Sequence, residues 1–146
     1  MSATTTLNPQ VIGQAENAHG PLLARILARS GTTFHQWVAL TTLAAGGGTA
    51  GRDQLVGRMT GALKIDDAAA AEALAGLTAA GLLQALPGDG AQVGLTPAGQ
   101  ARYGEIRAAV DEVIAQVYGD IPPEDLATAG RVLAQITARA NELAAG

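Results

Sequence analysis

The sequence contains no cysteine, which excludes disulfide bonds, thiolate zinc sites and cysteine-based redox sensing. Aromatic residues make up only 3% of the 146 residues, so the core must be built mainly from small and branched aliphatic side chains. No uncharged apolar run approaches the about 18 residues that a membrane-spanning helix needs. The opening segment, MSATTTLNPQ, lacks the charged and apolar regions of a signal peptide. We therefore expect a soluble cytoplasmic protein of one domain, with no membrane contact.

Basic residues are also few. The chain has 9 Lys and Arg residues against 13 Asp and Glu residues, which gives a net charge of −4. Because phosphate neutralisation supplies much of the affinity of proteins for DNA, this balance argues against tight non-specific binding. A local basic patch can nevertheless override the total charge. The segment GGGTAG follows a predicted helix and is not followed by Lys-Ser or Lys-Thr, so we do not expect a phosphate-binding loop.

Helix signals dominate what is present. Asn8 and Pro9 form a cap and a first helical position, and Thr96 and Pro97 repeat that pair further along the chain. Gly81 is placed to end a helix as its C-cap. Two short apolar segments, LLQAL and QVGLT, flank a Pro-Gly-Asp-Gly turn and predict a β-hairpin. The predicted helices cover about 8–30, 32–45, 50–60, 65–80, 97–117 and 123–143.

The terminal helical regions carry long apolar stripes that a small central domain cannot cover. In the last two helices, apolar residues recur at three- and four-residue spacing from Tyr103 to Val117 and from Leu126 to Leu143. A twofold homodimer is the commonest way to bury such stripes. The alternative is an intramolecular bundle of the first, fifth and sixth helices.

Several segments together resemble the MarR family of bacterial regulators. FHQWVALTTLA and RDQLVGRMTGAL resemble its second and third helices, and LTAAGLL resembles the end of its reading helix. LTPAGQA resembles the exit from its wing, and IPPEDLATAGRVLAQI resembles its last dimerisation helix. The resemblance implies a mainly α fold with a small β-hairpin, in which a winged helix-turn-helix core at 32–96 lies between dimerisation helices at 8–30 and 97–144. It also implies a homodimer, binding to palindromic DNA and a ligand pocket between the dimerisation helices and the winged helix.

The residues at the DNA-reading positions depart from the family pattern. The reading positions of the fourth helix fall on Ala68, Ala69, Ala71 and Glu72, where family members usually carry Ser, Thr and Arg. Alanine offers only apolar contact to a base, and a glutamate near phosphate is repelled. The wing loop, PGDGAQ, has no Arg and contains Asp89. The cations left for phosphate contacts are Arg52, Arg58 and Lys64. The ordinary alternative is that these three are solvated surface charges.

The candidate ligand site centres on the segment TFHQW. Its two rings and its histidine suit a pocket in which apolar side chains surround a few polar groups. The ordinary alternative is that Phe34 or Trp37 only fills the core. The resemblance implies that this helix begins beside the ligand site, and Tyr103 is placed to form another wall. The candidate ligand-binding residues are Phe34, His35, Trp37, Tyr103 and His19.

Three functions remain open from the sequence. The first is a ligand-responsive transcription regulator that binds DNA. The second is a family member with impaired DNA binding, whose pocket serves small-molecule binding or catalysis, with His35 as a general base oriented by Glu16 or by an acid of a second subunit. The third is a protein-interaction module. Two histidines without a carboxylate cluster predict no metal site, no cofactor is expected, and the residues favour a protein that is not an enzyme.

Overall fold

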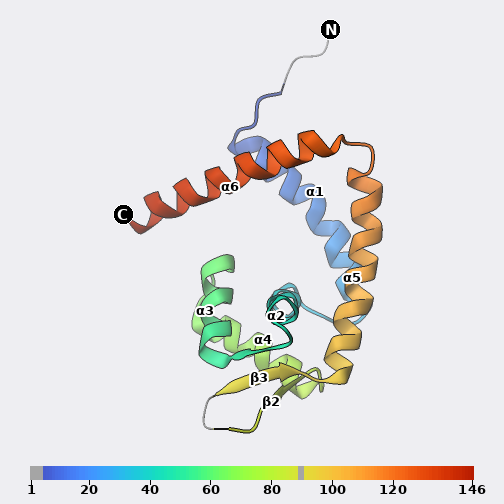
Figure 1. Cartoon of the computed structure of the whole chain (residues 1–146), viewed down its shortest axis with the longest axis vertical. Helices are drawn as coiled ribbons and strands as arrows, with labels where there is room; N and C mark the ends of the chain where they lie inside the picture. Colours follow the sequence, from blue (N-terminus) through green and yellow to red (C-terminus); the bar gives the residue numbers. More distant parts are fainter. Residues whose placement is uncertain (1–4, 89–90) are drawn as a thin grey trace. The chain divides into compact units, whose positions relative to one another are not determined.

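The computed structural model describes residues 5–88 and 91–146. The turn residues Asp89 and Gly90, on which part of the wing prediction rests, lie outside the described residues. The chain divides into two compact units, Met1–Val110 and Asp111–Gly146. The elements, labelled in Figure 1, are α1 Pro9–Ala28, α2 Phe34–Ala45, β1 Thr49–Gly51, α3 Arg52–Leu63, α4 Asp67–Ala79, β2 Leu83–Ala85, β3 Gln92–Leu95, α5 Pro97–Tyr118 and α6 Pro123–Ala145. The predicted fold class, mainly helical with a small β-hairpin, is confirmed.

The predicted helix starts at Asn8 and Thr96 are confirmed by their hydrogen bonds. The Asn8 side chain accepts a hydrogen bond from the backbone N–H of Val11 at 3.0 Å, ahead of Pro9 at the first helical position. The Thr96 hydroxyl accepts one from the backbone N–H of Gly99 at 2.9 Å. Each cap satisfies an N–H group that has no partner inside its helix.

The boundaries of α3 and α4 differ from the prediction. The helix predicted to stop before a turn at Gly61 continues to Leu63, and it ends where Lys64 adopts a left-handed conformation with φ 58°. A glycine costs helix stability but does not end a helix unless the chain turns there. The next helix begins at Asp67 rather than Ile65, because the Asp66 side chain caps it by accepting from the N–H of Ala69 at 2.8 Å.

The β-structure has one more strand than predicted. The hairpin strands β2 and β3 pair antiparallel, and β1 pairs with the other edge of β3, which gives the order β1-β3-β2. Gly94 lies opposite Thr49 on one side and Gln84 on the other. Because β1 precedes α3 directly, the sheet anchors the start of α3 as well as the wing.

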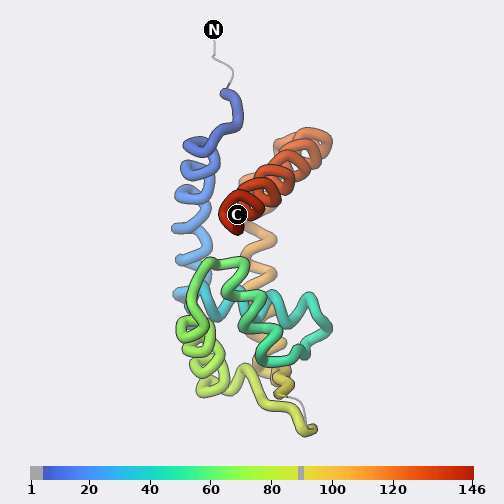
Figure 2. The backbone as a smooth tube through the Cα atoms, turned by 90° about the vertical axis from the view of Figure 1, so that its left-hand side faces the viewer, coloured from blue at the N-terminus to red at the C-terminus, as the bar shows by residue number. Residues whose placement is uncertain are grey.

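The core of the first unit lies where α2, α3 and α4 pack against one another and against the sheet (Figure 1, Figure 2). Aliphatic side chains fill it, as the scarcity of aromatics requires. The largest fully buried side chains are Leu40, Leu43, Leu55, Met59, Leu74 and Leu77.

The second unit exposes its apolar side chains in the single chain. In α6, which the structure describes in full, no residue is buried. Large apolar side chains exposed in this unit are Ile114, Val117, Ile121, Leu133, Ile136 and Leu143. The helix is amphipathic, so one face of α6 is an apolar stripe without cover from its own unit. Among residues 5–88 and 91–146, no helix combines the length and the apolar character that crossing a membrane requires.

Candidate functional site

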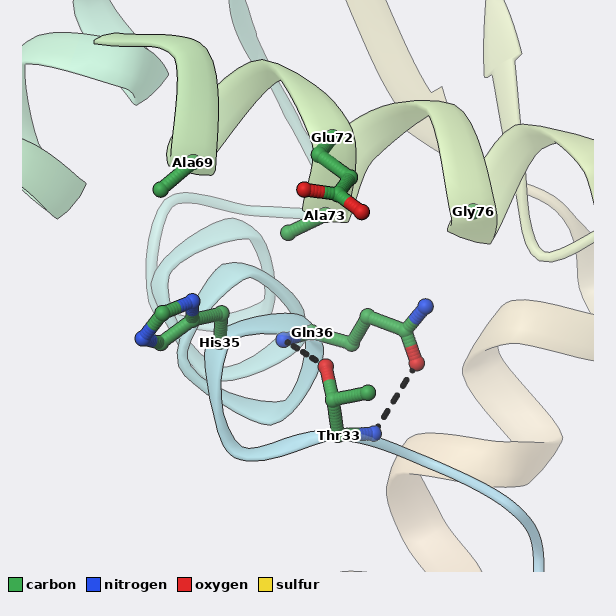
Figure 3. A pocket seen from close by; sticks show the side chains of 7 residues that line it. All are labelled: Thr33, His35, Gln36, Ala69, Glu72, Ala73 and Gly76. Carbon is green, nitrogen blue, oxygen red and sulfur yellow. Dashed lines mark hydrogen bonds between the residues drawn. The ribbon is translucent and has the colours of Figure 1, made fainter. Parts of the chain in front are cut away.

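A groove with a volume of about 380 Å³ lies between the start of α2 and one side of α4 (Figure 3). Both helices belong to the first unit. The groove is partly open to solvent and mixes small apolar side chains with polar ones. Its lining residues are Thr33, His35, Gln36, Ala69, Glu72, Ala73 and Gly76. A concave site of this size and composition suits a small molecule.

The α2 wall is fixed by a capping box. The Thr33 hydroxyl accepts a hydrogen bond from the N–H of Gln36 at 3.1 Å, and the Gln36 side-chain oxygen accepts one from the N–H of Thr33 at 3.0 Å. The dashed lines in Figure 3 mark this reciprocal pair. It holds the Gln36 side chain in one orientation and leaves the amide nitrogen of that side chain as a donor.

The loop before α2 is fixed by a second set of hydrogen bonds. The Arg102 guanidinium of α5 donates from Nη1 to the carbonyl oxygen of Ser30 at 3.1 Å and to the hydroxyl of Thr32 at 3.3 Å. The hydroxyl groups of Ser30 and Thr32 lie 2.8 Å apart, and Thr32 is buried. The α2 wall of the groove is therefore held in place from α5 as well as by its own cap.

The α4 wall is made of small residues and one carboxylate. Ala69, Ala73 and Gly76 recur at helical spacing on the side of α4 that faces His35 and Gln36, and Glu72 lies on the same side (Figure 3). A Cβ atom added at Gly76 would lie 2.5 Å from the amide nitrogen of Gln36. The absence of a side chain at residue 76 therefore leaves room for the end of the Gln36 side chain.

α4 contributes to both the core and the groove. Ala70, Ala73, Leu74 and Leu77 are buried. Ala69, placed by the family resemblance among the reading positions, is half-buried and lines the groove. The helix begins two residues later than predicted, and packing against both α2 and α3 sets its rotation.

The structure brings Trp37 and Tyr103 together. Their rings stack with centroids 5.5 Å apart and planes at 21°, and only 6% of Trp37 is exposed. Phe34 is 47% exposed, and its ring centroid lies 6.4 Å from that of His35, with the ring planes at 57°. The two rings of the aromatic segment therefore separate: Trp37 is buried and stacks on the half-buried Tyr103 of α5, whereas Phe34 is exposed beside His35.

The other candidates lie apart from the groove lining. His19 is exposed on α1, where its Nδ1 lies 2.6 Å from the carbonyl oxygen of Ala15. The acidic residue that shares the groove with His35 is Glu72, whereas the sequence had suggested Glu16. Within the described part of the chain, no group of three or more His, Asp or Glu side chains is placed to hold a metal ion.

The candidate phosphate contacts lie on α3 and on the turn after it. Arg52 is half-buried at the first turn of α3, and its backbone N–H donates to the carbonyl oxygen of Ala91 at 2.6 Å. Arg58 is exposed on the same helix, and Lys64 is exposed at the left-handed residue between α3 and α4. This turn joins the two helices of the helix-turn-helix.

His35 is the predicted ligand residue that lines the groove, and the sequence did not predict the groove itself. The capping box was readable from Thr33 and Gln36, which have the spacing of that motif. The position of Gly76 against Gln36 was not readable, because it depends on how two helices distant in the sequence cross. Glu72 was noticed only as an unfavourable reading residue.

Comparison with known proteins gives a consistent result for the fold. No protein-family model and no curated protein sequence matches the chain significantly. Among solved structures, NadR in complex with 4-hydroxyphenylacetate is 25% identical, with a TM-score of 0.73 over 90% of this chain and 96% of that one. BpsR of Bordetella bronchiseptica, described with regulation of its DNA binding by 6-hydroxynicotinic acid, is 20% identical, with a TM-score of 0.70 over 93% and 98% of the two chains.

A MarR-family transcriptional regulator from Silicibacter pomeroyi gives a TM-score of 0.77 at 21% identity, covering 91% of this chain and 88% of that one. These likenesses extend over nearly the full length of each partner, so they include the terminal helices as well as the winged helix. The fold of this chain is therefore the winged-helix fold of the MarR-family regulators.

Proposed function

We propose that the protein is a homodimeric transcription regulator that binds DNA through its winged helix and responds to a small organic ligand. The observation that carries the proposal is the near full-length likeness to NadR and BpsR, one described in complex with 4-hydroxyphenylacetate and the other with DNA binding regulated by 6-hydroxynicotinic acid. The exposed apolar stripe of α6 supports the dimer, since such a stripe needs a partner surface. A regulator of this kind acts in the cytoplasm.

The proposed DNA interface consists of α4 flanked by phosphate contacts from α3. Arg52, Arg58 and Lys64 supply the positive charge there. Three phosphate contacts per subunit support salt-sensitive binding of modest strength. The α4 residues contribute shape and apolar contact rather than hydrogen-bond donors.

The test is a fluorescence anisotropy titration of the DNA upstream of the protein's own gene at low salt. Replacing Arg58 or Lys64 by Ala is expected to weaken binding and to reduce the slope of log K against log salt by about 1 per site. Arg139→Ala, at an exposed position of α6, is the control for the same loss of positive charge outside the interface. Absence of any binding at micromolar protein would overturn the proposal.

The proposed ligand site is at the aromatic segment of α2 and the facing part of α5. The exposed ring of Phe34 and the half-buried ring of Tyr103, which stacks on the buried Trp37, supply its apolar surface. The first probes are 4-hydroxyphenylacetate and 6-hydroxynicotinic acid, and the expected result is quenching of Trp37 fluorescence together with altered DNA affinity. Trp37 is the sole tryptophan of the chain, so its emission reports this site directly.

A second candidate function follows from the chemistry of α4. The helix carries Asp67 and Glu72 and no Lys or Arg over its whole length. A winged-helix dimer that has lost strong DNA reading and keeps its pocket for small-molecule binding, or for catalysis with His35 as the base, fits this observation. Ligand binding without DNA binding in the titrations above would favour this candidate.

A further inference from the structure

The groove between α2 and α4 carries one acidic side chain. Among its seven described lining residues, Glu72 is the only Asp, Glu, Lys or Arg side chain. Figure 3 shows Glu72 on the side of α4 that faces His35 and Gln36. Glu72 is exposed, so water screens its charge, and a cation held there gains from contact with the concave lining as well as from the carboxylate.

We propose that this groove binds a small organic cation, a flat amine or amidine, through the carboxylate of Glu72. This site is separate from the Trp37–Tyr103 pair, and its preferred charge is opposite to that of 4-hydroxyphenylacetate. Binding of a cation in this groove does not require the protein to bind DNA.

The shape of the α4 wall favours a flat ligand. Ala69, Ala73 and Gly76 carry no atom beyond Cβ, so a ring can lie against the helix without displacing a side chain. The volume of about 380 Å³ lies within the range of about 300–1,000 Å³ found for small-molecule sites.

The α2 wall supplies polar partners that are already oriented. The Gln36 side-chain oxygen is engaged by the N–H of Thr33 at 3.0 Å, which directs the amide nitrogen toward Gly76 as a donor. The imidazole of His35 adds a ring face and two nitrogen atoms. A ligand with an amine at one end and a hydroxyl or carbonyl acceptor at the other can therefore contact Glu72 and Gln36 without an entropic cost for ordering the Gln36 side chain.

Occupancy of the groove would change the charge of the reading helix. A bound cation neutralises Glu72, and a DNA-binding surface with one negative charge fewer gains affinity for phosphate. This consequence rests on the proposed function: the ligand is expected to strengthen DNA binding rather than release it.

The test compares two probes that share a 4-hydroxyphenyl ring and differ in charge, tyramine and 4-hydroxyphenylacetate. Each is titrated into the full-length protein, and binding is followed through backbone amide chemical shifts. Tyramine is expected to shift the amides of Thr33, Gln36, Ala69 and Gly76. Glu72→Gln is expected to weaken tyramine about three- to tenfold, as for loss of a partly exposed charge-assisted contact.

Two matched controls separate charge and shape from general effects. Glu105→Gln makes the same charge change on the exposed face of α5 and is expected to leave tyramine binding unchanged. Ala69→Leu fills the groove and is expected to abolish binding, whereas Ala75→Leu adds the same side chain at an exposed α4 position outside the lining and is expected to preserve it. Glu72→Lys reverses the charge at the groove and is expected to exclude tyramine.

Equal tyramine affinity in the wild-type protein and Glu72→Gln would overturn the inference, as would tyramine shifts confined to residues around Trp37 and Tyr103. A parallel DNA titration separates this result from the proposed function. If the protein does not bind DNA and its tyramine affinity depends on Glu72, the proposed regulator is wrong and the cation site is supported. If the protein binds DNA and its tyramine affinity does not depend on Glu72, the regulator is supported and the cation site is wrong.

Discussion

Gly99 allows α5 to begin directly against the chain that leaves α4. The N–H of Thr96 donates to the carbonyl oxygen of Leu82 at 3.1 Å, and the Thr96 hydroxyl donates to the carbonyl oxygen of Gly81 at 2.6 Å. A Cβ atom at Gly99 would collide with the Leu82 carbonyl oxygen and lie 3.3 Å from a methyl group of Leu95. The residue therefore fixes the start of α5 relative to the winged helix.

Gly99→Ala is expected to lower the free energy of unfolding by about 1–3 kcal/mol, because the obstructing atom belongs to the backbone and cannot rotate away. Urea denaturation followed by circular dichroism measures the change. Gly104→Ala, in the same helix, is the control, since its Cβ atom would meet no described atom within 4 Å. That variant is expected to gain about 0.4–1 kcal/mol. A loss at residue 104 equal to that at residue 99 would contradict this account.

At the scale of elements, α2 depends on its cap more than on its helix propensity. The helix contains Val38 and two threonines within twelve residues, and these β-branched residues favour helix less than Ala or Leu do. The Thr33–Gln36 box satisfies N–H groups at a helix end that also forms one wall of the groove. The cap thus contributes to stability and to the shape of the site together.

Thr33→Ala is expected to destabilise the protein by about 0.5–2 kcal/mol through loss of the cap. It should also release the Gln36 side chain from its fixed orientation and lower the affinity of any ligand that binds in the groove. Thr33→Ser keeps the hydroxyl and is expected to stay within a few tenths of the wild type in stability, with the cap intact. Thermal unfolding of both variants measures the difference, and identical midpoints for the two would show that the cap contributes nothing.

Some of the secondary-structure elements could be predicted from the sequence, and others could not. Asn8 and Thr96 cap their helices through local side-chain hydrogen bonds, so those two starts could be predicted. β1 could not, because Thr49–Gly51 shows no alternation of its own and becomes a strand only by pairing with β3.

The groove could not be predicted from the sequence for a related reason. Gln36 and Gly76 are each unremarkable in the sequence, and they form a wall only where α2 and α4 cross. Phe34 and Trp37 have the spacing of one helix face, yet the stack with Tyr103 buries the second and leaves the first exposed. Local signals therefore indicated a candidate site at the start of α2, and tertiary contacts decided which of its side chains line the groove.

For the whole molecule, the prediction that tests the architecture concerns the proposed dimer. Leu133 and Ile136 lie on the apolar stripe of α6 and are 38% and 39% exposed in the single chain. If the stripe is buried by a second copy, a carboxylate there must be desolvated on association, which costs several kcal/mol. Ile136→Asp is therefore expected to convert a dimer to monomer at micromolar concentration, as measured by light scattering after size-exclusion chromatography.

Gln135→Asp is the control, since it places the same carboxylate next to Ile136 at an exposed polar position of α6. It carries the same helix-propensity cost of Asp and is expected to remain dimeric. The wild-type unfolding midpoint should rise with protein concentration, as for any folded state that associates, and that of Ile136→Asp should not. If the wild-type protein is monomeric at high concentration, the proposal of a homodimeric regulator is wrong. The apolar stripe of α6 would then be covered by the intramolecular bundle, which the sequence also permits.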